Sequence, residues 1–248
     1  MSKPKIIIAA LILALSIAGA YFIILNYKSS EPVNKNLTGE VLNNNLVGIE
    51  PVNSGSQNLT DLLTQKLEER IGEQNTGGFQ SVDGKTLISA PDPKQLAEEL
   101  IAEAEENFDA SLLRGKVDES RLKISEDISK EAITKYFDSF SQIMIQANKN
   151  TPAAIDEPEK MTISDFGKIR DIYKEAVNSF YNLSAPKSVL AIHKKEIELL
   201  STKENIYSVI ANAEEDPMTA FLAVDELLKI EQEFDKLKID IGNFLKTV

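Results

Sequence analysis

The C-terminal part of the chain carries apolar residues at alternating spacings of three and four positions, a pattern that places them on one face of an α-helix. The last such segment opens at Asp216-Pro217, where an N-cap residue precedes a proline suited to the first helical position. Its apolar positions are Ala220, Ala223, Leu227, Ile230, Phe234, Leu237, Ile241 and Phe244. The spacing predicts one long helix that buries a single face.

Four earlier segments also carry apolar residues at helical spacing, every four positions in the first and mainly alternating three and four in the others, and predict four more helices. The first opens at Asp92-Pro93 and the second at Ser125, the third follows a proline-containing loop, and the fourth opens at Ser184-Ala185-Pro186. Their apolar positions are, in order, Leu96, Leu100, Ala104 and Phe108; Ile133, Phe137, Phe140, Met144 and Ala147; Phe166, Ile169, Tyr173, Ala176 and Phe180; Leu190, His193, Ile197, Leu200 and Tyr207. The stretch 110–124 lacks this spacing, and it is left open as extended or irregular.

Helices with one apolar face and short connections pack side by side at crossing angles of roughly 20°. We therefore expect an all-α fold in which residues 92–248 form an antiparallel helical bundle of four to five helices. The aromatic residues of the apolar faces are expected in its core.

An uncharged stretch of 20 residues, IIIAALILALSIAGAYFIIL, occupies positions 6–25. As a helix it would span about 30 Å, the thickness of the hydrocarbon core of a membrane. Lys3 and Lys5 precede it, and no acidic residue occurs before Glu31, a bias that favours a cytoplasmic N-terminus. We expect residues 1–28 to form a short cytoplasmic tip and a transmembrane helix, with the remaining chain outside the cytoplasm.

A secretory signal peptide is the alternative reading of the same stretch. Ala18-Gly19-Ala20 matches the small-x-small pattern of a cleavage site, and cleavage near Ala20 would release a secreted protein. The apolar run continues past that site to Leu25, which favours retention as an anchor. Both readings export the rest of the chain.

Residues 29–91 are predicted to form a polar, largely disordered tether, because residues 29–58 are rich in Asn, Ser, Gly and Pro and have little apolar surface to bury. Within the tether, apolar residues at helical spacing predict a short helix near 60–72: Leu59, Leu62, Leu63, Leu67 and Ile71. Asp83-Gly84 between short apolar stretches gives a weak hairpin signal.

Charge and cysteine content exclude several classes of function. The chain holds 27 Lys and Arg against 39 Asp and Glu, a net charge of −12. An acidic surface repels nucleic-acid phosphates, so we expect no nucleic-acid partner. Because there is no Cys, the chain has no disulfide, no thiolate metal site and no Cys nucleophile.

His193, the single histidine, is the one weak candidate for a binding residue. Glu196 follows three positions later, which gives a His-x-x-Glu pair. A carboxylate-bridged di-iron bundle needs a Glu-x-x-His pair on each of two helices, so one histidine cannot complete it. We expect no metal site, no cofactor and no catalytic residues, with Asp118-Glu119-Ser120 as the only faint carboxylate candidate for hydrolysis.

The expected function is that of a single-pass membrane-anchored protein, a non-enzymatic binding or structural module of the cell envelope. Its partners would be membrane lipid, through residues 6–25, and an envelope protein; self-association into a homo-oligomer is left open. Two alternatives remain: an extracytoplasmic sensor or ligand-binding bundle that signals through a partner, and an exported carboxylate-based hydrolase.

Overall fold

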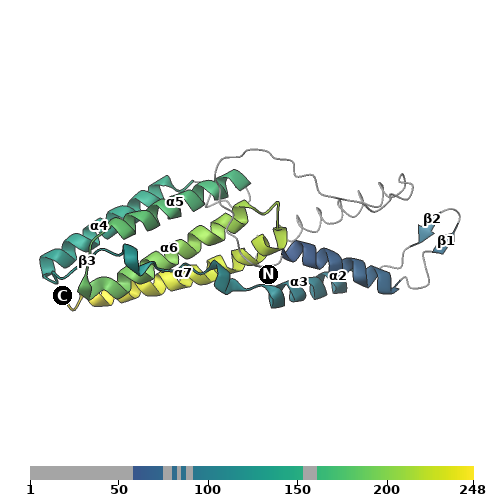
Figure 1. The fold of residues 1–248 in the computed structure, drawn as a ribbon, viewed down its shortest axis with the longest axis horizontal. Coiled ribbons are helices and arrows are strands. Elements are labelled where there is room, and N and C mark those ends of the chain that lie inside the picture. The colour runs from purple at the N-terminus through teal and green to yellow at the C-terminus, as the bar shows by residue number, and fades with distance from the viewer. Residues whose placement is uncertain (1–57, 75–79, 83–84, 88–91, 153–160) are drawn as a thin grey trace. The chain divides into compact units, whose positions relative to one another are not determined.

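The computed structural model describes residues 58–74, 80–82, 85–87, 92–152 and 161–248, all within one compact unit, Gln57–Val248. The described part is mainly helical, which confirms the all-α class (Figure 1). Its α-helices are α2 (Leu59–Gln74), α3 (Pro93–Asn107), α4 (Lys130–Asn150), α5 (Ile163–Asn182), α6 (Leu190–Ala211) and α7 (Pro217–Leu245). Two short strand pairs are β1 (Gln80–Val82) with β2 (Lys85–Leu87), antiparallel, and β3 (Ile124–Ser125) with β4 (Ala185–Pro186), parallel.

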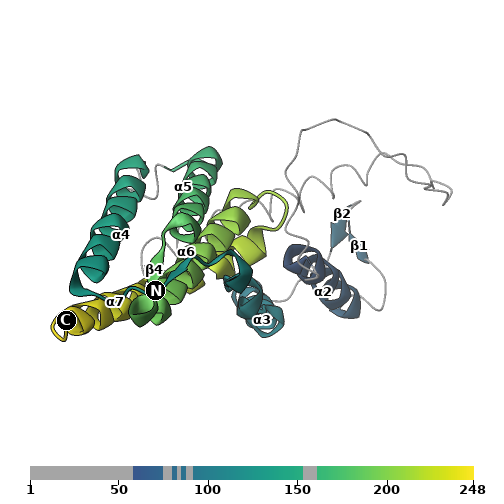
Figure 2. The same cartoon turned by 60° about the vertical axis from the view of Figure 1, so that its left-hand side comes forward.

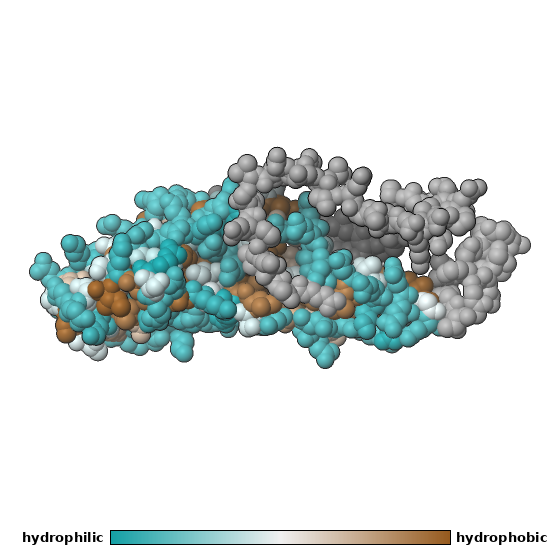
Figure 3. Space-filling view, viewed as in Figure 1, coloured by the Kyte–Doolittle hydropathy of each residue, from teal (hydrophilic) through white to brown (hydrophobic). Residues whose placement is uncertain are grey.

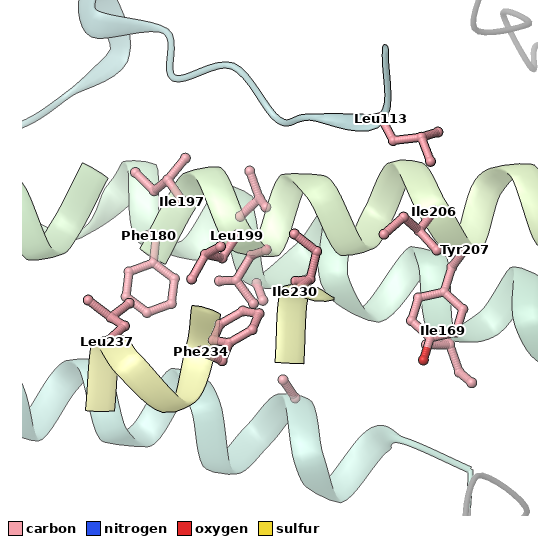
Figure 4. Close-up of a cluster of buried hydrophobic side chains, with 14 of the residues drawn as sticks. Leu113, Ile169, Phe180, Ile197, Leu199, Ile206, Tyr207, Ile230, Phe234 and Leu237 are labelled. Carbon is pink, nitrogen blue, oxygen red and sulfur yellow. The ribbon is translucent and has the colours of Figure 1, made fainter. Parts of the chain in front are cut away.

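The main hydrophobic core lies between α5, α6 and α7. Figures 1 and 2 show α6 between the other two helices, and it packs along both. In Figure 4, Phe180 of α5 lies beside Phe234 and Leu237 of α7. Residues of the predicted apolar faces that are fully buried include Ile169, Phe180, Ile197, Leu200 and Ile230. The three-four spacing therefore identified the buried faces of these helices correctly.

Helix α4, which lies beside α5, is held mainly through its N-terminal half. There Tyr136 and Phe137 pack with Val189, just before α6, and with Phe244 near the end of α7. The Phe137 and Phe244 rings lie 6.1 Å apart. In the C-terminal half of α4 the only buried residue is Ala147. One end of α4 is thus anchored in a core, and the other is packed lightly.

The segment between α3 and α4, residues 108–129, crosses α6 as an irregular strap. Gly115 comes so close to α6 that a Cβ atom at this position would lie 2.4 Å from the Cβ atom of Ser201. The Gly115 N–H donates a hydrogen bond of 2.9 Å to Oγ1 of Thr202. Any side chain at position 115 would push the strap away from the helix.

The stretch that the sequence left open consists of two 3₁₀ turns, Ala110–Leu113 and Glu119–Arg121, followed by β3. Because Ser125 belongs to β3, the next helix begins at Lys130 and not at Ser125. Ser129 caps it by accepting a hydrogen bond from the Ala132 N–H.

Two of the three predicted proline-containing helix starts are confirmed. Asp92 accepts hydrogen bonds from the first turn of α3, and Asp216 does so for α7. The third prediction, at Ser184-Ala185-Pro186, is wrong because Ala185 and Pro186 pair with β3 instead. A 3₁₀ turn follows, and α6 begins at Leu190 without a side-chain cap.

The α2–α3 pair packs on the start of α7, through a small apolar cluster formed by Leu59, Leu63, Ala104, Met218 and Leu222. The Asp216 carboxylate joins the two regions: it accepts hydrogen bonds from the N–H groups of Leu59 (2.9 Å) and Thr60 (3.2 Å) and from Thr219 (3.1 Å). The first predicted bundle helix, α3, therefore pairs with α2 instead of joining α4–α7 in one bundle. The sequence placed α2 in the tether, but it lies within the compact unit.

The predicted anchor at residues 6–25 and the tether residues up to 57 lie outside the described residues. Among the helices that the structure describes, none is long and apolar enough to cross a membrane.

Candidate functional site

His193 lies at the centre of a buried polar cluster beneath the N-terminal half of α4. Its side chain is completely buried, and Nδ1 lies 3.1 Å from the Tyr136 hydroxyl of α4. The ring of Phe180, from α5, packs 6.0 Å away. The single histidine of the chain is thus enclosed by α4, α5 and its own helix.

Glu196, one turn further along α6, is also buried, with 2% of its surface exposed. Its Oε1 atom has no hydrogen-bond partner among the described residues, and neither has Nε2 of His193. Buried polar atoms are almost always hydrogen-bonded, so two such atoms on adjacent turns of one helix are unusual. The sequence identified the His-x-x-Glu spacing, and the structure places both side chains inside the protein.

Burial favours the neutral form of both side chains. It lowers the pKa of His193 to about 4 and raises the pKa of Glu196 to about 7, although Lys203 and Lys238 act against the latter shift. Burial together with the charge of Glu196 also raises the pKa of Tyr136. Tyr136 therefore keeps its hydroxyl proton, and where the hydroxyl donates a hydrogen bond to Nδ1 of His193, the neutral imidazole carries its own proton on Nε2.

Lys203, two turns beyond Glu196, is a buried cation whose role is structural. Its ammonium lies 2.6 Å from the Glu231 carboxylate and 4.5 Å from the centre of the Phe234 ring. The Tyr173 ring lies 5.1 Å away on another side. An ion pair and two aromatic faces offset the cost of burying the charge, and they connect α5, α6 and α7.

A cleft of about 330 Å³ lies between α4 and α5, along the lightly packed half of α4. Its lining residues are Gln142, Ile143, Gln146, Ala147 and Asn150 of α4, and Ile172, Glu175, Ala176 and Ser179 of α5. Three carboxamides therefore follow one another at one-turn intervals along α4, facing a carboxylate and a hydroxyl across an apolar floor. A cleft of this volume is in the range of ligand pockets in proteins.

The other candidate for chemistry, Asp118-Glu119-Ser120, forms a surface turn of the strap. The Glu119 carboxylate lies 2.6 Å from the Lys194 ammonium, and Asp118 caps the turn through Ser120. Both carboxylates are thus engaged in holding the strap. Among the described residues, no group of three or more His, Cys, Asp or Glu side chains is placed to hold a metal ion.

Exposed apolar side chains are spread over several elements. They include Ile128 in the strap, Ile145 in α4, and Leu228 and Ile239 in α7. Figure 3 shows apolar areas separated by polar side chains on the face that it draws. The exposed apolar residues therefore do not outline a site as well as the cleft does.

In comparisons with protein-family models, curated proteins and solved structures, nothing matches the chain. Its own residues must therefore carry any inference about function. Sequence reasoning missed Tyr136 and the cleft. Tyr136 lies one turn after Ile133 and next to Phe137, so the helical spacing contained a signal for its burial, but none for its contact with His193.

Proposed function

We propose that this chain is a single-pass membrane-anchored protein whose helical unit, outside the cytoplasm, binds an envelope protein without catalysing a reaction. The observation that carries the proposal is the cleft between α4 and α5, where one wall is the lightly packed half of α4. The anchor is supported by the uncharged apolar sequence 6–25 and the lysines before it.

The lining of the cleft suits a helix of the partner protein. Ile143 and Ile172 supply apolar surface, while Ala147 and Ala176 leave room for a close approach of another backbone. Glu175 has no ion-pair partner among the described residues, so it is available to a Lys or Arg of the partner. We expect an amphipathic helix with small apolar residues on one face and a basic residue at its edge.

Overall charge also favours a basic partner over a second copy of the chain. The chain carries −12 and its first 56 residues carry +1, from four Lys and three Glu, which leaves −13 on the compact unit. Two such units repel each other at low ionic strength, whereas a basic segment is attracted.

A binding role agrees with where the structure places the only imidazole. His193 is completely buried beneath α4 and has no surface that a substrate could reach. Proton transfer to a bound substrate would need α4 to move away first. The cleft, in contrast, is lined by neutral amides and one carboxylate that can recognise a partner as they stand.

Site-specific photo-crosslinking tests the binding proposal in cells that make the full chain. A photoreactive residue at Gln146, inside the cleft, should give one discrete crosslinked protein of a different mass, whereas the same residue at Asn148, on the exposed side of α4, should not. Filling the cleft by Ser179→Trp should abolish the Gln146 product. Crosslinks that do not depend on position, or a product with the mass of two copies of this chain, would contradict the proposal.

The proposed topology is tested separately. The full chain should sediment with membranes, stay there in carbonate at high pH, and be digested by protease added to the outside of spheroplasts. Recovery of a shortened chain in the medium would favour cleavage near Ala20, and recovery of the intact chain in the soluble cytoplasmic fraction would overturn the topology.

A further inference from the structure

The Tyr136–His193 hydrogen bond joins α4 to α6 at the end where α4 is anchored. Tyr136 is buried, with 2% of its surface exposed, and its ring packs against those of Phe137 and His193, 5.1 and 5.8 Å away. With the hydroxyl proton donated to Nδ1, His193 must present an N–H at Nε2. That donor has no acceptor among the described residues.

The second unpartnered atom is complementary to the first. Oε1 of Glu196 is an acceptor without a donor, and it lies three residues from His193 on the same buried face of α6. Side chains three residues apart on a helix are neighbours, with about 5–6 Å between their Cβ atoms. The two groups can therefore meet through a small side-chain rotation or one bridging water.

We propose that His193 and Glu196 form a proton-linked latch beneath α4: α4 is held in place while both side chains are neutral, and it loosens when Glu196 loses its proton. A neutral Glu196 fits the buried site, and its carboxyl oxygen can accept from the Nε2–H of His193. An ionised Glu196 would place a charge inside the protein, where it acts on the Tyr136 hydroxyl of α4.

The titratable groups around Glu196 are Tyr136 from α4, His193 and Lys203 from α6, and Lys238 from α7. The two lysines favour the ionised form of Glu196, but each has another carboxylate at close range: Glu231 lies 2.6 Å from Lys203, and Asp235 lies 2.9 Å from Lys238. Burial therefore outweighs them, and the pKa of Glu196 is raised to about 7.

The two members of the latch make opposite contributions to the pH dependence of stability. Glu196 has a pKa of about 7 in the folded protein against an ordinary 4.5, so its contribution is complete below pH 4.5 and is lost as the pH rises through 7. His193 has a pKa of about 4 against an ordinary 6.5, so its contribution grows as the pH rises from 4 to 6.5. Between pH 4.5 and 6.5 the pair holds one titratable proton in either state: on Glu196 in the folded protein and on His193 in the unfolded protein. The opposite pH dependences that the two residues give to the free energy of unfolding therefore cancel.

Substituting one residue of the pair at a time, in the full chain solubilised in mild detergent, should make the pH dependence contributed by the other residue measurable. The ratio of the unfolding equilibrium constants of variant and parent removes the pH dependence of all other groups. For Glu196→Gln this ratio should fall by up to about tenfold per pH unit between pH 4.5 and 6.5. For His193→Gln, which keeps an acceptor for Tyr136, it should rise over the same range by the same factor. Glu198→Gln, which removes a carboxylate of the same helix that pairs with Lys195, is the matched control and should show neither slope.

Hydrogen exchange in the unsubstituted chain tests the latch without any variant. After correction for the intrinsic pH dependence of exchange, the amides of α4 should lose protection between pH 6 and 8, and those of α5 and α6 should lose much less. Ratios that stay flat for both variants, slopes of the same sign, or equal loss of protection in α4 and α6 would overturn the latch.

The latch lies under the helix that forms one wall of the cleft, so a pH-dependent affinity for a partner would follow; only this consequence rests on the proposed function. Both experiments are made without a partner. A failed crosslink at Gln146 therefore leaves the latch standing, and flat pH ratios leave the cleft as a binding surface.

Discussion

Helices α4 and α6 are similar in length but differ in how they are held. α6 buries ten of its 22 residues, and α4 buries four of its 21. Both show the same alternation of apolar positions, so the difference arises from the number of neighbours. α6 has α5 on one side, α7 on another and the strap over a third, whereas α4 packs on α5 and is buried mainly in its N-terminal half. The sequence spacing of apolar residues thus identifies a face and does not show how much of it is covered.

The largest predicted effect tests the well-packed side of this comparison. Phe180→Ala removes a fully buried ring that contacts Phe140 and His193, and it should reduce the free energy of unfolding by about 3–5 kcal/mol. Denaturant unfolding of the full chain measures it. Phe140→Ala, on the half-buried face of α4, should cost clearly less; an equal loss would mean that α4 is packed as tightly as α5.

An intermediate effect is expected where the strap meets α6. Gly115→Ala brings a methyl group against Ser201 and the backbone oxygen of Glu198, at 2.4 and 2.5 Å, so the strap must shift at a cost of about 1–3 kcal/mol. Gly167→Ala in α5 is the control because nothing lies within 4 Å of its Cβ position. It should be neutral or stabilise α5 by up to about 1 kcal/mol. An unchanged melting temperature for the Gly115 variant would mean that the strap does not press on α6 in solution.

The smallest effect is predicted on the free side of α4. Ile145 is 52% exposed, so Ile145→Ala should change the free energy of unfolding by less than about 0.5 kcal/mol. The same unfolding measurement is sufficient. A loss above 1 kcal/mol would show that this side of α4 is covered in the isolated protein, for example by self-association, and sedimentation at two concentrations would then identify that state.

Local signals predicted the parts of the fold that local chemistry determines. Asp92 and Asp216 each precede a proline and cap a helix, and the buried faces of α5, α6 and α7 follow their apolar spacing. The partner of α3 was not predictable in this way, because an apolar face does not specify which other face will cover it. For the same reason the spacing gave no indication that Gly115 would lie against α6, 87 residues away in the chain from its hydrogen-bond partner.

The candidate site shows the same limit. His193 and Glu196 could be paired from the sequence because three residues on a helix set their separation. Their burial depends on neighbouring helices, among them α4 with Tyr136, and burial also keeps the histidine neutral. The cleft was missed because it results from the incomplete coverage of α4, and a sequence pattern records no such gap.

The shared carboxylate of Asp216 has a mechanical consequence. A force applied to the chain before α2 would act first on the hydrogen bonds from Leu59 and Thr60 to Asp216. The Asp216 carboxylate also accepts the hydrogen bond from Thr219 in the first turn of α7. Tension therefore passes directly from one helix end to the other, so the first elements to yield would be these two helix ends together, while α4 remains unloaded.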